Sequence, residues 1–145
     1  MITHSLSTAH HRIGSNFLVF ALTVFFGVSC GVSPTQSDSV ERAFEQHQSG
    51  VAVEGEGVVS KILPDDAEGL RHQRFILRLS SGQTVLIDHN IEVAPRVEVL
   101  KTGDTVSFSG EYVWNQQGGL VHWTHHDPAN RHAAGWLKHN GRTYH

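Results

Sequence analysis

From Val51 onward the chain consists of short segments in which apolar and polar residues alternate, and several of these segments contain glycines. The first of them, residues 51–63, carries Gly55 and Gly57 in its interior. Alternation with a period of two is typical of a strand with one buried face. A glycine inside a strand often marks a bulge or a sharp bend, which a small closed barrel needs. The pattern therefore indicates a strongly bent sheet.

Five strands are predicted in this part of the chain, separated by turns and by one longer connector. An acidic turn follows the first strand, Ser81-Gly82 forms a tight hairpin, and residues 90–100 contain Pro95 and lack clean alternation. Five short strands with an irregular connector after the third predict a mainly β fold, a small five-stranded Greek-key barrel of the OB type. A small mixed sandwich or another open barrel fits the same pattern. The predicted strands are residues 51–63, 71–79, 83–89, 105–114 and 120–124.

Two shorter elements flank the predicted barrel. Ser39 is expected to cap a short N-terminal helix over residues 40–48, whose apolar residues recur at helical spacing, and Gly50 ends it. At the other end, residues 133–144 are predicted to form either a short helical turn or a small hairpin around Asn140-Gly141. The irregular connector between the third and fourth strands is expected to contain one helical turn.

The first thirty residues have the pattern of a secretion signal. The apolar run Phe17–Phe26 is ten residues long, whereas a helix that spans a bilayer needs roughly 20. Residues 27–30 follow it and resemble a bacterial lipoprotein cleavage site, in which Cys30, the only cysteine, would be lipidated. The alternative is ordinary signal cleavage nearby, with Cys30 removed or left as a free thiol. The expected organisation is a signal peptide over 1–30, a flexible tether over 31–39 and the barrel domain over 40–145.

The charge balance of the chain limits the partners that it can attract. The formal net charge is -3 with neutral histidines, whereas binding to the nucleic-acid backbone needs a basic groove. We therefore do not expect nucleic acid as a partner. We expect a monomer in the periplasm, or anchored to a membrane and facing the periplasm, with lipid contact only through its N-terminus. A single cysteine forms no intramolecular disulfide, so an exported fold depends on its core alone.

Histidine is the unusual component of the chain, with twelve residues of this type. Six of them follow Glu111, and the segment 119–132 is the richest in groups that bind a metal or move a proton near neutral pH. We expect a divalent transition metal to bind here, and zinc is the favoured metal. Two alternatives are a ligand-binding rim without metal and polar loop histidines without a common site. The candidate metal ligands are His122, His125, His126, Asp127 and His132.

The spacing of these residues sets a condition on a shared metal site. His122 and His126 lie on one face of a strand about 13 Å apart, at ~3.3 Å per residue, whereas a metal lies ~2.0 Å from each nitrogen. A shared site therefore requires the strand to end or bend near Thr124, which Pro128 favours because proline restricts the residue before it. The expected local ligand pairs are then His125 with Asp127 and His126 with His132.

The start of the second strand and the end of the third carry further polar candidates. His72 and Arg74 share a strand face. If this face reaches the histidine-rich mouth, they form with Trp123 a site for a small anionic ligand, because a guanidinium suits phosphate or carboxylate. The alternative is a solvated strand face. Asp88 is expected either to orient a histidine of the 122–132 stretch or to belong to a strand-ending turn with Asn90 as its cap.

Four large aromatic residues are concentrated late in the chain. Exposed on an OB-like face, such rings stack on bases or sugars, whereas buried rings fill a core that has few other large side chains. The near-neutral charge argues against bases, so the core interpretation is favoured. These residues are Tyr112, Trp114, Trp123 and Trp136.

Three motifs resemble a known family: RHQRFIL at residues 71–77, GEYxWN at residues 110–115 and HWTHHDP at residues 122–128. On these motifs the chain resembles a family of small exported bacterial proteins that are classed as a domain of unknown function, over roughly residues 40–145. The resemblance implies an exported single domain. It supplies neither a substrate nor catalytic residues.

The leading hypothesis is an exported binding module whose histidine-rich rim binds a divalent metal, or an anionic ligand through Arg74 and the histidines. The alternative is a metal-assisted or histidine-dependent hydrolase of phosphoester or cell-envelope substrates, in which a metal activates water and Glu111 or Asp88 is the base. A third hypothesis is an envelope protein whose aromatic face meets a protein partner. The sequence lacks a phosphate-binding glycine loop and C-x-x-C, and its G-x-S-x-G match at residues 27–31 falls at the end of the predicted signal peptide. Nucleophilic catalysis by serine or cysteine is therefore not supported.

Overall fold

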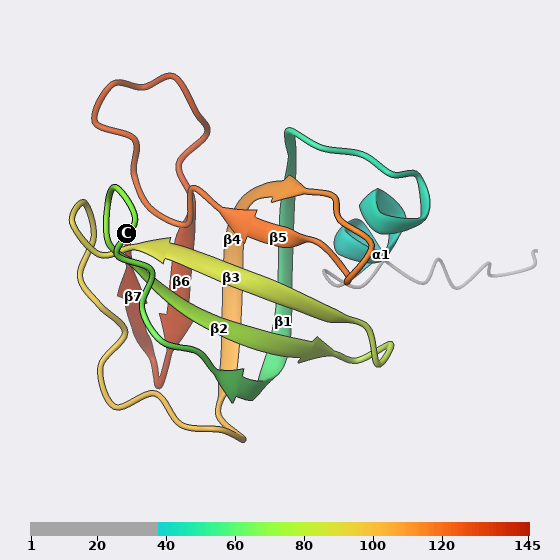
Figure 1. Ribbon diagram of the computed structural model, residues 1–145, viewed down its shortest axis with the longest axis horizontal. Helices are drawn as coiled ribbons and strands as arrows, with labels where there is room; N and C mark the ends of the chain where they lie inside the picture. The colour runs from blue at the N-terminus through green and yellow to red at the C-terminus, as the bar shows by residue number, and fades with distance from the viewer. Residues whose placement is uncertain (1–37) are drawn as a thin grey trace, which may run out of the picture. The chain divides into compact units, whose positions relative to one another are not determined.

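The computed structural model describes residues 38–145 (Figure 1). The predicted signal peptide, lipidation at Cys30 and most of the predicted tether lie outside the described residues. Within the described part, no helix is long and apolar enough to cross a membrane. The elements are α1 (Asp38–Glu45), β1 (Val51–Ile62), β2 (His72–Leu79), β3 (Thr84–Asn90), β4 (Thr105–Val113), β5 (Leu120–His122), β6 (Trp136–His139) and β7 (Arg142–Tyr144).

The first five strands close into a barrel. β1 pairs antiparallel with β2, β2 pairs antiparallel with β3, and β3 pairs in parallel with β5. β5 then pairs antiparallel with β4, which returns to β1 and closes the circle. This order confirms the predicted mainly β, five-stranded OB-like Greek-key barrel with a short N-terminal helix. The β6–β7 hairpin extends the sheet beyond β4 (Figure 1).

The glycines of β1 allow one long strand to serve two neighbours. Residues 51–58 of β1 pair with β4 and residues 57–62 pair with β2, with an irregularity between Val59 and Lys61. A Cβ at Gly55 would lie 2.8 Å from the ring of Phe108, and a Cβ at Gly57 would lie 2.9 Å from the carbonyl oxygen of Arg78. Larger residues would therefore push neighbouring strands away at the bend, as the glycine pattern predicted.

The core consists of the inward-facing residues of the barrel strands. Phe75, Ile87, Phe108 and Tyr112 are fully buried there. The Tyr112 hydroxyl donates a hydrogen bond to the carbonyl oxygen of Gly118 at 3.0 Å, so this ring fills the core without leaving its polar end unsatisfied. Burial of the hydroxyl raises the pKa of Tyr112.

The helix α1 covers the end of the barrel that bears the loop between β4 and β5. Val40 and Ala43 are buried in the core, and the Trp114 indole N–H donates to the carbonyl oxygen of Phe44 at 3.1 Å. Ser39 was predicted to cap the helix, but α1 already includes it, and its hydroxyl donates to the carbonyl oxygen of Glu54 at 2.9 Å. The helix is therefore fixed to β1 through this side chain.

The two irregular segments have the local structures that the sequence allowed. In the connector after β3, the Ala94 N–H donates to the carbonyl oxygen of Asn90 at 3.2 Å, which closes one helical turn. The tail forms the hairpin of β6 and β7, and Asn140 and Gly141 at its turn have φ values of 48° and 77°. Such a pair of left-handed residues matches the twist of a two-residue hairpin turn.

Candidate functional site

The strand β5 ends at His122 because the chain has to leave the sheet there. β4 pairs with β6 up to Ser109 and with β5 from Glu111 onward. A Cβ at Gly110 would lie 2.4 Å from the carbonyl oxygen of His122, and one at Gly135 would lie 2.0 Å from that of Trp123. Only glycines therefore allow both ends of the 123–135 loop to pass against β4. A shared metal site required the strand to end or bend near Thr124, and β5 ends two residues before it, at His122.

Asp127 organises this loop. Its carboxylate accepts hydrogen bonds from the N–H groups of Ala129 (2.9 Å), Arg131 (2.7 Å) and His132 (3.2 Å). These bonds, first that of Ala129, hold the pKa of Asp127 below its usual value. Both carboxylate oxygens are engaged with the loop backbone, so Asp127 acts as its anchor. The sequence offered a sign of this role, since Asp often bonds the backbone two residues further on.

Glu111 connects two of the predicted histidines. Its Oε1 lies 3.4 Å from Nε2 of His122 and its Oε2 lies 3.1 Å from Nδ1 of His132. The indole of Trp123 stacks on the His132 ring with a centroid distance of 3.8 Å and an interplanar angle of 12°. His132 is thus held by a carboxylate and an aromatic ring, and His126, its expected partner, is exposed. This carboxylate bridge was not predicted from the sequence.

The predicted metal ligands do not form one ready-made site. Among residues 38–145, no group of three or more His, Cys, Asp or Glu side chains is arranged so that it could hold a metal ion as placed. His122 and His132 meet at Glu111, Asp127 holds the loop, and His126 faces solvent. His125 is buried, with 3% of its surface exposed, and faces a different group of residues.

A small pocket of about 150 Å³ brings His125 together with residues of the second and third strands. The β2–β3 pairing sets His72 opposite Asn90, and the parallel β3–β5 pairing sets Ile87 beside Val121, so that the next residues along the two strands, Asp88 and His122, both line the pocket. The face of His72 therefore reaches the histidine-rich mouth, as the sequence required for a shared site. The pocket is lined by Leu70, His72, Asp88, Asn90, His122, Trp123 and His125.

Two imidazoles of this pocket have their Nδ1 atoms fixed by backbone carbonyls. Nδ1 of His72 lies 2.7 Å from the carbonyl oxygen of Leu70, and Nδ1 of His125 lies 2.8 Å from that of His126. A carbonyl oxygen only accepts hydrogen bonds, so Nδ1 carries the proton in each neutral ring and Nε2 keeps its lone pair. Histidines that bind metals are commonly oriented in this way.

Asp88, which lines the same pocket, has an unsatisfied acceptor. Its Oδ1 is buried and has no hydrogen-bond partner in the described part of the chain. Burial raises the pKa of Asp88, an effect that His72 and Arg74 partly offset. A buried carboxylate oxygen without a partner is costly, and a cation or a donor would satisfy it.

Arg74 does not line this pocket. Its Nη1 lies 3.5 Å from Oδ2 of Asp66, and its Nε donates to the carbonyl oxygen of Pro64 at 3.3 Å. Asp88 stands opposite it in the β2–β3 pairing. The guanidinium is thus flanked by two carboxylates, which compete with any anionic ligand for the charge of Arg74.

His89 lies behind the pocket and was not among the predicted site residues. It is fully buried, its Nε2–H donates to the carbonyl oxygen of Pro95 at 3.1 Å, and its Nδ1 accepts from the Thr124 hydroxyl at 2.8 Å. Burial lowers the pKa of His89 to about 4, so the ring is neutral at pH 7. It ties β3 to the residue before His125, and its inward place in the alternation of β3 was the signal for this role.

A family described as "Protein of unknown function (DUF3465)" matches residues 23–145, and the chain belongs to this family. No curated protein matches the chain. The resemblance to a family of unknown function is thereby confirmed, whereas the three motifs as its signature and the exported status stay predictions.

Proposed function

We propose that this DUF3465 protein is a binding module that takes up one divalent transition metal ion, zinc first, in the pocket of His72, Asp88 and His125. The observation that carries the proposal is the pair of imidazoles whose Nδ1 atoms are bonded to carbonyls, beside a carboxylate oxygen without a partner. Residues 17–30 support placing this module outside the cytoplasm, free in the periplasm or anchored through Cys30.

The donor set fits a borderline metal. Two imidazole nitrogens and one carboxylate oxygen are ligands that zinc accepts, and His122 or water would complete four-fold coordination. The side chains have to turn toward one another, because no three of them are arranged to hold an ion as they stand in the described chain. His122 is one-third exposed, so its ring has room to turn.

Electrostatics favours a cation over an anion in this pocket. The charge of Asp88 is disfavoured by burial, and a bound cation would offset that cost. An anion would instead meet the carboxylates of Asp88 and Asp66, and the latter already engages Arg74. The anionic-ligand form of the sequence hypothesis is therefore the weaker one.

The test is elemental analysis and zinc calorimetry on the untagged protein and on two single variants, His72→Ala and His125→Ala. We expect about one zinc per chain in the wild type and a loss of at least tenfold in affinity in each variant. His126→Ala is the matched control, because His126 adjoins His125 in sequence but is exposed and lines no part of the pocket. Metal-free protein that does not bind added zinc would contradict the proposal, as would equal loss in the control.

A hydrolase that uses the same metal is the second candidate, and the raised pKa of Asp88 in a pocket is the observation that favours it. In this case Asp88 takes a proton from water and is not a ligand. Asp88→Asn would then keep its zinc and lose turnover of a chromogenic phosphodiester. In the binding module, the same variant loses zinc.

A further inference from the structure

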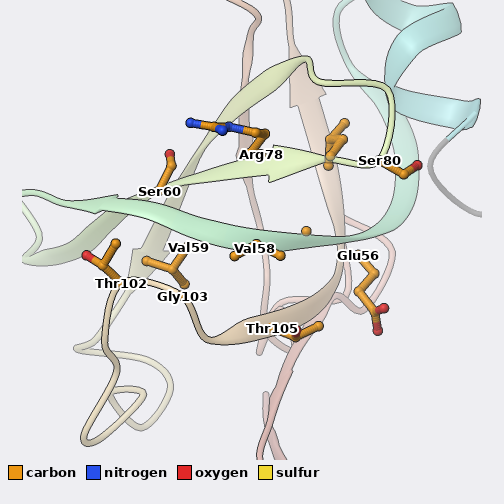
Figure 2. A pocket seen from close by; sticks show the side chains of 11 residues that line it. Glu56, Val58, Val59, Ser60, Arg78, Ser80, Thr102, Gly103 and Thr105 are labelled. Carbon is orange, nitrogen blue, oxygen red and sulfur yellow. The ribbon is translucent and has the colours of Figure 1, made fainter.

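A groove of about 580 Å³ lies on the outer face of the barrel and shares no lining residue with the histidine pocket. Figure 2 shows its walls, with Arg78 on β2, Val58 on β1 and Thr105 at the start of β4. Its volume falls within the roughly 300–1,000 Å³ that is usual for sites of small molecules. Nothing in the proposed metal chemistry uses this groove.

The floor of the groove is the point at which β1 passes from one neighbour to the other. Val58 pairs with Thr105 of β4 on one side and with Arg78 of β2 on the other. Beyond it, the turn before β4 continues along β1, since the Gly103 N–H donates to the carbonyl oxygen of Val59 at 2.8 Å. The Val58 side chain is 45% exposed, so the groove has an apolar floor that is open to solvent.

The two charged residues of the groove differ in how well they are satisfied. The Glu56 carboxylate accepts a hydrogen bond from the Ser107 hydroxyl at 2.7 Å. The Arg78 side chain is exposed and forms no hydrogen bond or ion pair within residues 38–145. The free hydrogen-bonding capacity of the groove is therefore that of a cation, and Arg78 is the residue paired with the exposed Val58 in the β1–β2 register.

We propose that this groove binds a single-chain anionic amphiphile, with its carboxylate or phosphate head on the Arg78 guanidinium and its apolar chain over Val58. A guanidinium forms paired, charge-assisted hydrogen bonds with either head group. Covering the valine removes apolar surface from water. Glu56 lies on the same strand face and repels an anion, so it directs the head toward Arg78.

The test is a titration of ¹⁵N-labelled, metal-free protein with sodium decanoate below its critical micelle concentration, followed by NMR. We expect saturable shifts of the amides of Gly57, Val58 and Gly103. Arg78→Gln should weaken binding by about tenfold or more. Glu56→Gln should tighten it by a smaller factor, because a like charge is removed. Arg71→Gln, the same change at an arginine outside the groove, is the matched control and should leave binding unchanged.

The possible outcomes distinguish a free amphiphile from a membrane surface, and some of them overturn the proposal. Decanoate binding that depends on Arg78 supports a free amphiphile. Absence of decanoate binding overturns the proposal, and capture on phosphatidylglycerol vesicles that is lost in Arg78→Gln would then assign the Arg78 contact to a membrane surface instead. Equal binding of decyltrimethylammonium, or unchanged binding in Arg78→Gln, overturns the proposal. Melting curves verify that Arg78→Gln is folded, and metal-free protein keeps the result independent of the zinc experiment.

Discussion

The two ends of the barrel are constructed in different ways. At one end α1 places Val40 and Ala43 in the core, and Trp114 donates to the helix backbone. At the other end histidines replace apolar residues, and Asp88 has a buried oxygen without a partner in the described chain. One end of the barrel thus has mainly apolar packing, and the other places a carboxylate among histidines. In the described chain, Oε2 of Glu41 on α1 is also buried without a partner, so the contrast lies in the histidines and not in the carboxylate alone. Stability and binding capacity should therefore respond to different substitutions.

The largest expected effect on stability is at the end that α1 covers, in Gly119→Ala. Gly119 has a φ of 86°, and a Cβ there would lie 2.1 Å from the hydroxyl oxygen of Tyr112. We expect a loss of roughly 3 kcal/mol or more in unfolding free energy, measured by urea denaturation, with zinc binding per folded molecule unchanged. Gly141→Ala is the control, because Gly141 has a φ of 77° but open space around it, and should lose only about 1–2 kcal/mol.

The next effect should appear at the histidine end as the pH falls. The pKa of His89 is about 4 in the folded protein and near ~6.5 in the unfolded chain, so the unfolded state takes up the proton first. The contribution of His89 is thus complete above pH ~6.5 and is lost toward pH 4, by roughly 3 kcal/mol in total. Urea denaturation across this range should show a shallower pH dependence for His89→Gln. Equal slopes would show that this ring does not govern the acid sensitivity of the loop.

The smallest effect on stability is expected in Asp88→Asn, and it should be a gain, whereas the two changes above are losses. Because burial raises the pKa of Asp88, its ionised form costs stability at pH 7, and this cost disappears as the pH falls through the raised pKa. The variant should be more stable at pH 7 by less than about 1 kcal/mol, since water partly screens the charge. Asp127→Asn should instead lower the melting temperature, because the ionised Asp127 holds three N–H groups. A loss of stability in Asp88→Asn would contradict this contrast.

Most of the fold was predictable because it depends on local patterns. Alternation located the five strands to within one or two residues at most ends, and Gly55 and Gly57 indicated the bend that closes the barrel. The prediction that Ser39 caps the helix was wrong. Residue-type preference does not reveal that its hydroxyl donates a hydrogen bond to Glu54 on β1. The β6–β7 extension was predicted only as one of two possibilities for the tail.

The sequence predicted which residues belong to the candidate site better than it predicted which of them lie together. His72, Trp123 and His125 were identified by residue type and do share a pocket. Their meeting with Asp88 depends on the parallel pairing of β3 with β5, which joins segments that are distant in sequence. For the same reason, the sequence did not show that His132 turns to Glu111, 21 residues away. The role of Asp127 is local and had a sequence signal, but it was read as metal binding.

The closure of the barrel by β1 and β4 also determines the order in which the protein can fold. β1, β2 and β3 are joined by short connections and form antiparallel pairs, whereas β4 has to return across the chain to reach β1. Such non-local pairing loses the conformational entropy of the closed loop before the stabilising contacts form. Folding is therefore slow, and small β-barrels take about milliseconds to seconds. The histidine pocket needs β3, β5 and the loop that follows. Because β5 and this loop come late in the chain, a chain synthesised only as far as β4 lacks the histidine pocket.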